Sequence, residues 1–210
     1  MGIRERKERE FQRREREILD AALALFNRDD WQSVTVERIA QEAEIGKGTV
    51  YKHFDSKEEI YARLALDFLH GIVYRLQQVD IALGVVEQLR VMIRVYWDAH
   101  MESKEYARVV MYCSRDDFRA CLRAETQAAF EAVDDAFAEV VHPLIERGVS
   151  EGIFPQKSVP LLLFGAAAAL KGGIAMAWSE CPVKGLKPRE HREELTSFIL
   201  AGLIHQGQRA

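Results

Sequence analysis

The sequence predicts an all-α protein, and three observations support this prediction. Apolar residues recur three and four positions apart in successive segments, which is the period of an amphipathic helix. Only five prolines and no long Gly/Ser tract interrupt the 210 residues, so long helices can form. No stretch has a convincing strand pattern, and no internal repeat is present. A hydrophobic content of 48% is sufficient for a substantial core.

Residues 1–16 are highly charged, with seven basic and four acidic side chains. Their Glu and Arg residues alternate at helical spacings, which favours a helical extension of the following segment or a frayed arm. Such a segment either lies along phosphate groups or is only the solvated end of a helix. It contains no apolar region of the kind that a secretory signal requires, so we expect a cytoplasmic protein.

Two short helices joined by a tight turn are predicted between Thr35 and Lys57. Thr35 is a suitable N-cap for the first of them, because its hydroxyl can accept a free backbone N–H. The first helix has one apolar face, and Ile45 is expected to fill the turn against that face. The face consists of Val36, Ile39, Ala40 and Ala43.

The second short helix contains no Asp or Glu from Ile45 to Phe54, although the chain has a net charge of -4. A helix that excludes acids in an acidic protein is suited to a polyanion, and the geometry is that of a DNA-binding helix-turn-helix. Val50 and Phe54 form its apolar side. We expect Gly48 and Thr49 to approach the bases and Tyr51, His53 and Lys57 to bind phosphates. The predicted DNA-binding residues are Thr35, Lys47, Gly48, Thr49, Tyr51, Lys52, His53 and Lys57. The alternative for this face is an ordinary solvated basic surface.

Six further helices are predicted after this unit. The first begins with Ser56 as its cap and Glu59 three residues later, the pattern of a capping box. The long segment 118–152 contains Pro143, which should kink it. The predicted ranges are 56–78, 85–102, 104–113, 118–152, 158–179 and 188–206.

The segment 160–178 is almost entirely apolar and has the length of a membrane span. Lys171 lies near its middle, and no positive flank is present to orient a span. Its small residues and an apolar stripe on the last helix instead predict a four-helix interface in a homodimer, without a membrane. The predicted interface residues are Gly165, Ala168, Ala169, Gly172, Phe198, Ile199 and Gly202.

A small-molecule pocket is predicted in the second half of the chain. Met92, Tyr96 and His100 follow one another at four-residue spacing, and four further aromatic residues can face them, namely Tyr112, Phe130, Phe137 and Phe164. Each residue taken singly fits an ordinary core, but the polar tips of Tyr96, His100 and Tyr112 favour a pocket because buried polar groups need partners. The complete predicted set is Met92, Tyr96, His100, Tyr112, Phe130 and Phe137.

Enzyme signatures are missing from the sequence. It has no His-Glu-x-x-His, no Gly-x-Ser-x-Gly, no phosphate loop and no dinucleotide glycine pattern. We therefore expect no catalytic residues, no bound metal and no cofactor. The three cysteines, at 113, 121 and 181, are too few and too scattered for a disulfide framework and suit a reducing compartment.

The stretches ILDAALALF (18–26) and VTVERIAQEAEIGKGTVYKHFDSKEEIY (34–61) resemble the N-terminal domain of the tetracycline-repressor (TetR) family. The resemblance covers roughly residues 14–64. It implies a three-helix DNA-binding unit that reads DNA with the helix at 46–53 and holds phosphate at Lys57. It also implies dimerisation by the last two long helices and a ligand pocket whose occupancy changes the spacing of the DNA-reading units.

Three residues depart from the family pattern. Asp30 and Glu44 stand where the family usually has Gly, and Gly46 replaces the usual Ser or Thr cap. Glu44 should have to adopt a left-handed backbone, at a cost of about 1 kcal/mol.

The sequence thus predicts a helix-turn-helix domain at 1–57 and a helical ligand-binding and dimerisation domain at 58–210. The first contains 12 basic and 12 acidic residues and the second 17 and 21, so the second is the acidic part. The predicted function is a small-molecule-responsive transcriptional repressor that binds a palindromic operator. The alternative is a DNA-binding protein without small-molecule control.

Overall fold

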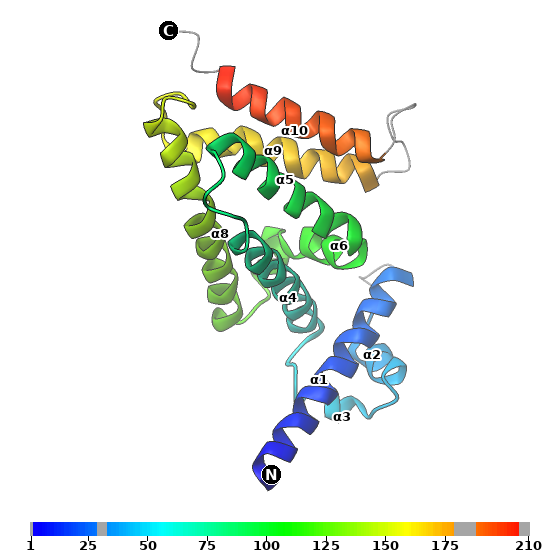
Figure 1. The fold of residues 1–210 in the computed structure, drawn as a ribbon. Helices are drawn as coiled ribbons and strands as arrows, with labels where there is room; N and C mark the ends of the chain where they lie inside the picture. Colours follow the sequence, from blue (N-terminus) through cyan, green and yellow to red (C-terminus); the bar gives the residue numbers. More distant parts are fainter. Residues whose placement is uncertain (1, 29–32, 179–187, 206–210) are drawn as a thin grey trace. The chain divides into compact units, whose positions relative to one another are not determined.

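The computed structural model describes residues 2–28, 33–178 and 188–205, which form helices joined by turns (Figure 1). No strand occurs within these ranges, so the predicted all-α class is confirmed for them. The helices are α1 Ile3–Arg28, α2 Val36–Glu42, α3 Lys47–Val50, α4 Lys57–Gln77, α5 Val85–Glu102, α6 Lys104–Cys113, α7 Asp116–Arg119, α8 Ala124–Ser150, α9 Val159–Trp178 and α10 Pro188–His205.

The chain divides into two compact units. Unit 1 contains residues 1–70 and 103–133, and unit 2 contains residues 71–102 and 134–210. Helices α4 and α8 each begin in unit 1 and end in unit 2. This division into packed units differs from the boundary at residue 57 that we expect between DNA-binding and ligand-binding roles, and the functional boundary stays a prediction.

Unit 1 is built on α1, which packs against α2 and α6. Its interior includes Ile18 and Ala22 of α1, Ile39 of α2 and Ile60 and Tyr61 of α4, each completely buried. The charged first turns continue α1 as the sequence predicted, because their side chains form pairs four residues apart, such as Gln12 with Glu8 at 3.0 Å. A single helix of 26 residues results.

The start of α4 confirms one half of the predicted capping box. Ser56 Oγ accepts the backbone N–H of Glu59 at 3.2 Å. The other half is wrong, because the Glu59 carboxylate does not return to Ser56. It accepts the backbone N–H of Arg123 at 2.8 Å and the hydroxyl of Thr126 at 2.6 Å, both at the start of α8. Glu59 is therefore a buried acid that caps a helix distant in sequence.

The single helix predicted over 118–152 is wrong, since the chain breaks between α7 and α8. The short α7 buries Phe118 in unit 1 and ends at Arg119. Gln127 stabilises the break by donating its side-chain amide to the carbonyls of Arg119 and Leu122, at 3.1 and 2.9 Å. Carbonyls freed at a helix end thereby gain partners. Apolar spacing alone does not reveal such a break.

The end of α8 requires two glycines. Gly152 has a φ of +73°, the left-handed conformation that terminates a helix, and Ile153 and Phe154 both donate their backbone N–H to the Gly148 carbonyl. A Cβ on Gly148 would lie 2.3 Å from the Phe154 ring. The sequence motif ERGVSEGIF is thus a helix stop followed by an aromatic residue that folds back.

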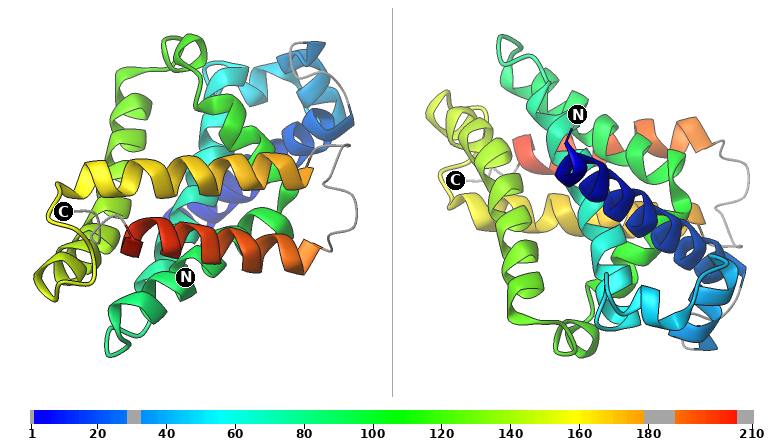
Figure 2. Two further views of the ribbon diagram at one scale, coloured as in Figure 1. Left: turned by 90° about the horizontal axis from the view of Figure 1, so that it is seen from above. Right: turned by 90° about the horizontal axis from the view of Figure 1, so that it is seen from below.

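Unit 2 contains α9 and α10 side by side, running in opposite directions (Figure 2, left), and α5 packs against both. The close approach depends on Gly173, where a Cβ would lie 2.4 Å from Leu195 of α10. Arg192 of α10 donates to Asp98 of α5 at 2.7 Å, and this hydrogen bond links α10 to α5. Gly173 was not among the small residues that the sequence predicted for close packing.

Helix α9 is long and apolar enough to cross a membrane by composition alone, the one such helix in the described ranges. Its most apolar 18-residue window has a mean hydropathy of 1.7, and only 11% of that window is buried. A core helix of a soluble protein would be mostly buried, whereas α9 presents an exposed apolar surface in the single chain.

Candidate nucleic-acid interface

Local interactions shape the helix-turn-helix as the sequence predicted. Thr35 has an extended backbone and its hydroxyl accepts the N–H of Arg38 at 3.3 Å, so it caps α2. The turn after α2 places Glu44 at a φ of +54°, the left-handed conformation expected there. Gly46 then caps α3 without a side chain, accepting the Thr49 N–H at its carbonyl. Asp30, the other departure at a usual glycine, lies outside the described residues.

Helix α3 is shorter than the predicted helix, ending at Val50 and continuing as turns to His53. Val50 is completely buried and Phe54 nearly so, so both lie on the inner side of unit 1 as expected. The N–H groups of His53 and Phe54 donate to the Val50 carbonyl at 2.9 Å. This short helix therefore has backbone hydrogen bonds at both of its ends.

The outer side of α3 exposes Lys47, Gly48, Tyr51 and Lys52, with Thr49 half-buried. Space beyond Gly48 is open, so a DNA backbone or base can approach the helix closely there. Lys47 forms an ion pair with Glu37 of α2, and its ammonium lies 5.6 Å from the centre of the Tyr51 ring. The acid-free helix thus has an acid beside it, contributed by α2, which the sequence pattern did not reveal.

Besides Lys47 and Tyr51, three more of the predicted DNA-binding side chains interact within the protein. Thr35 caps α2, and the Lys57 ammonium donates to the Val34 carbonyl at 3.0 Å. The His53 ring lies 4.1 Å from the Phe11 ring of α1, and its Nδ1 is buried without a partner among the described residues. Burial lowers the pKa of His53, with smaller contributions from Glu15, which raises it, and from Arg14 and Lys52, which lower it. A neutral His53 is a poor phosphate ligand.

Comparison with known proteins agrees with this geometry. Residues 18–64 match the family described as "Bacterial regulatory proteins, tetR family". The chain is 30% identical over 151 residues to the HTH-type transcriptional repressor KstR2 of Mycolicibacterium smegmatis, covering 70% of each protein. The chain belongs to the TetR family.

Other TetR-family members match over most of their length. The HTH-type transcriptional regulator SrpR of Pseudomonas putida is 24% identical over 187 residues, which span 87% of this chain and 80% of SrpR. The crystal structure of a tetR-family bacterial regulatory protein from Rhodococcus RHA1 has the same fold, with a TM-score of 0.74 at 21% identity, covering 90% of this chain and 96% of that one. This TetR-family chain is a DNA-binding transcriptional regulator.

The predicted pocket residues of this TetR-family regulator belong to both units, and each group is described by itself. In unit 2, Met92 and His100 are buried, and the Tyr96 ring lies 4.3 Å from His100 and 6.3 Å from Phe137. His100 Nδ1 donates to the Tyr96 carbonyl at 2.7 Å. In unit 1, Tyr112 contacts Phe118, and the Arg119 guanidinium covers Phe130 at 3.6 Å.

The predicted interface residues lie on the outer faces of α9 and α10, with one exception. Gly165, Ala168, Gly172 and Gly202 are exposed, Ala169 is half-buried and the Phe198 side chain is 70% exposed. Ile199 is only 3% exposed in the single chain, so it packs inside unit 2, and its part in a dimer interface stays a prediction. Leu161 and Met176 of α9 are also exposed, although the sequence predicted no role for them, and Phe164, which we expect to face the pocket, is 76% exposed.

The cysteines differ in their surroundings. Cys113 is completely buried, and burial raises the pKa of its thiol. Cys121 is exposed, and its thiol lies 3.3 Å from the Asp117 carbonyl. Cys181 lies outside the described residues. Within the described ranges no group of three or more His, Cys, Asp or Glu residues is arranged to hold a metal ion.

Proposed function

We propose that this TetR-family regulator is a homodimeric repressor of a bacterial cytoplasm, which binds palindromic DNA through α3 and is released by a small molecule. The observation that carries the proposal is the exposed face of α3. This face presents the two ammonium groups of Lys47 and Lys52, the hydroxyls of Tyr51 and the half-exposed Thr49, and an open backbone at Gly48. These groups can reach base edges and phosphates in a major groove.

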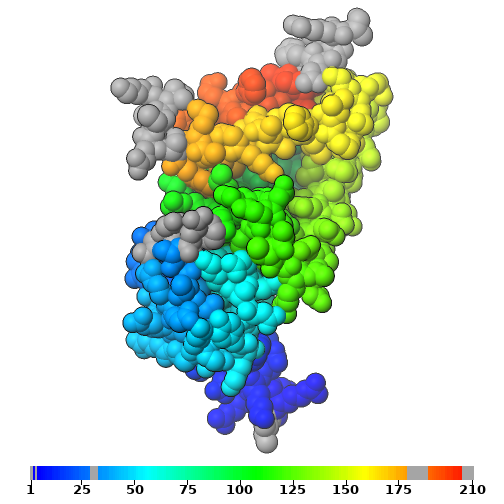
Figure 3. Space-filling view, turned by 180° about the vertical axis from the view of Figure 1, so that it is seen from behind, coloured from blue at the N-terminus to red at the C-terminus, as the bar shows by residue number. Residues whose placement is uncertain are grey.

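Dimerisation is supported by the outer surface of α9 and α10, which is continuous in the space-filling view (Figure 3, yellow to red). Leu161, Phe164, Met176 and Phe198 are each more than half exposed on it. Exposed apolar side chains among small residues are typical of a protein interface, and a self-complementary patch produces a two-fold dimer. A two-fold dimer would present two α3 helices to two half-sites, hence the palindrome.

Control by a small molecule is supported by the aromatic cluster of unit 2. Tyr96, His100 and Phe137 combine apolar rings with polar tips, as ligand sites do. Repression is supported by similarity, since KstR2 is named a repressor. Release requires that the ligand binds the DNA-free conformation more tightly than the DNA-bound one, and a hundredfold release needs about 2.7 kcal/mol of such a difference.

DNA recognition is tested by selecting binding sites from random duplexes with the full-length protein. We expect an enriched two-fold symmetric sequence. Thr49→Ala should relax the preference at one or two base positions, because a base contact is lost. Lys52→Ala should instead weaken all sequences alike and reduce the salt slope by about 0.9 for each lost phosphate contact. The control Lys104→Ala, at an exposed lysine of α6, should change neither. A selection without enrichment would refute the proposal.

The alternative function is DNA binding without small-molecule control. Native mass spectrometry of the purified protein distinguishes the two functions. A retained small molecule that also releases the selected DNA would support small-molecule control. A protein that retains nothing and keeps its DNA in a broad panel of apolar and aromatic acids would support the alternative.

A further inference from the structure

The first turns of α1 project from unit 1 beyond α2 and α3 (Figures 1 and 3, dark blue). Every described side chain from residue 4 to residue 13 is exposed, and residues 1–16 carry seven basic against four acidic groups. A helix with no core to pack on is stabilised only by pairs along its surface, which contribute a few tenths of a kcal/mol each. Its length is therefore not explained by the packing of unit 1.

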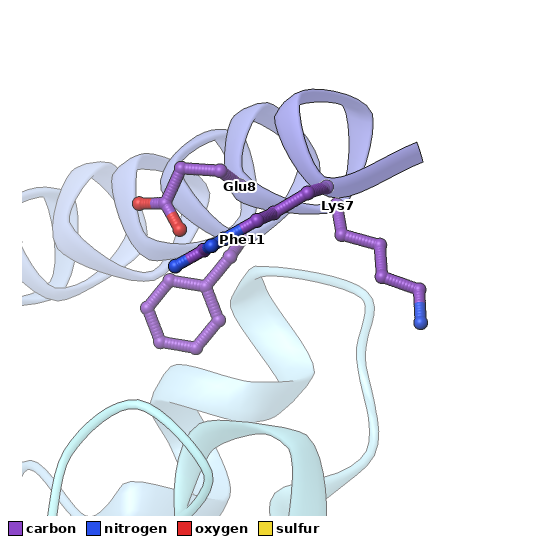
Figure 4. Close-up of a pocket in the computed structure, with 4 residues that line it drawn as sticks. Lys7, Glu8 and Phe11 are labelled. Carbon is purple, nitrogen blue, oxygen red and sulfur yellow. The ribbon is translucent and has the colours of Figure 1, made fainter. Parts of the chain in front are cut away.

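The projecting turns have two different faces. Arg4, Lys7 and Phe11 follow one another three and four residues apart and, with Glu8, line an open hollow of about 540 Å³ (Figure 4). Neither Arg4 nor Lys7 forms an ion pair with a described residue, and Glu8 accepts a hydrogen bond from Gln12 at 3.0 Å. Arg6 and Arg9 lie on the other side of the helix, where Arg9 donates to the Glu5 carbonyl.

Phe11 connects the first face to the DNA-reading helix. Its ring is directed from α1 toward the helices beside it in Figure 4, and it lies 4.1 Å from the ring of His53, three residues after α3 ends. The two ring planes are tilted by 31° to each other, so the contact joins α1 to the turn that follows α3. Arg4 and Lys7 therefore lie on the same face of α1 as Phe11, in the turns that extend beyond α3.

We infer that Arg4 and Lys7 form a second DNA-binding surface, which holds backbone phosphates outside the segment that α3 reads. The inference rests on DNA binding by α3 and adds to it a sequence-independent contact made by the N-terminal helix. The Lys7 ammonium can bind a phosphate as a point charge, and the planar Arg4 guanidinium can donate two hydrogen bonds to another. Each phosphate that they neutralise adds to the salt dependence of DNA binding. Phe11 is a positioning residue, since it sets where the projecting helix lies relative to α3.

The test compares two charge-matched double variants of the full-length protein on the selected DNA and on random duplexes. Arg4→Ala/Lys7→Ala should reduce the salt slope by about two for each protomer and weaken both kinds of DNA by roughly tenfold per lost contact at 0.1 M salt. The ratio of specific to random binding should stay the same. The control Arg6→Ala/Arg9→Ala removes the same charge from the opposite face and should leave the slope nearly unchanged.

Equal slopes for the two double variants would overturn the inference while leaving recognition by α3 intact. A loss of sequence preference in Arg4→Ala/Lys7→Ala would also overturn it, because phosphate contacts carry no sequence information. Failure of the unmodified protein to bind any duplex would instead overturn the proposed function itself. Circular dichroism melting of each variant checks that the substitutions leave the fold in place, as exposed positions should.

Discussion

At the scale of single residues, Glu59 shows how one side chain can join distant segments. It is buried, and its two oxygens accept from the Arg123 N–H and the Thr126 hydroxyl at the start of α8. The Arg123 guanidinium also forms an ion pair with Asp55 at 3.0 Å. The start of α4, directly after the helix-turn-helix, is thereby bound to the start of α8.

Removing this carboxylate should destabilise unit 1. In Glu59→Ala the N–H of Arg123 and the hydroxyl of Thr126 lose their acceptor, which costs about 1–3 kcal/mol. Urea denaturation followed by circular dichroism measures the loss. Glu58→Ala, at the less buried residue directly before Glu59, is the matched control and should lie within about 0.5 kcal/mol of the unmodified protein. Equal losses in both variants would contradict the capping role.

His100 predicts a dependence of stability on pH. Burial lowers its pKa in the folded protein, opposed by its bond to the Tyr96 carbonyl and assisted by Lys171. The unfolded chain then binds more protons near the ordinary value of 6.5, so stability is complete above that pH and falls as the pH decreases below it. Thermal melting at pH 7.5 and 5.5 should show a smaller difference for His100→Gln than for the unmodified protein. An identical difference in the two proteins would mean that the pKa of His100 is the same in the folded and the unfolded protein.

At the scale of elements, the turn between α2 and α3 contains strain at a single position. Glu44 has a left-handed backbone at φ +54°, where a side chain costs about 1 kcal/mol and glycine costs nothing. Glu44→Gly should therefore raise the free energy of unfolding by up to about 1 kcal/mol. Gln41→Gly, inside α2, should lower it by a similar amount. If both variants were destabilised equally, strain at Glu44 would be disproved.

Elements defined by local signals could be predicted from the sequence. The ends of α5 and α6, the Thr35 cap and the left-handed Glu44 all follow from neighbouring residues, and the structure confirms them. The break before α8 depends on Glu59, which is distant in sequence and accepts the Arg123 N–H, and on Gln127, which donates to the Arg119 carbonyl. The periodicity of apolar residues reveals neither interaction. The same limit applies to Gly173, whose role depends on Leu195 of another helix.

The candidate DNA site divides in the same way. Exposure of Lys47, Gly48 and Lys52 follows from the apolar positions of Val50 and Phe54 on a helix. The partners of Lys57 and His53 cannot be predicted in this way, because only tertiary packing brings Val34 to Lys57 and Phe11 to His53. Residue type and spacing therefore identified the surface, while the assignment of individual side chains to phosphates needed the fold.

At the scale of the whole molecule, assembly should depend on the outer face of α9 and α10. Phe198→Glu places a charge where an apolar ring is 70% exposed in the single chain, so the monomer should fold normally. In the dimer that charge would be buried without a partner, which should shift the protein toward monomer. Ile81→Glu, at another exposed apolar residue of unit 2, is the control and should remain dimeric. Sedimentation velocity at micromolar concentration distinguishes them, and a dimeric Phe198→Glu would move the interface elsewhere.

The projecting turns of α1 have a consequence for the length of DNA that this regulator occupies. Ten helical residues extend about 15 Å, which corresponds to roughly four base pairs at 3.4 Å per step. Hydroxyl-radical footprints should therefore be wider than the consensus derived from base substitutions, by a margin at each half-site that disappears without Arg4 and Lys7. Neighbouring promoters could then be occluded by a repressor whose recognised sequence does not overlap them.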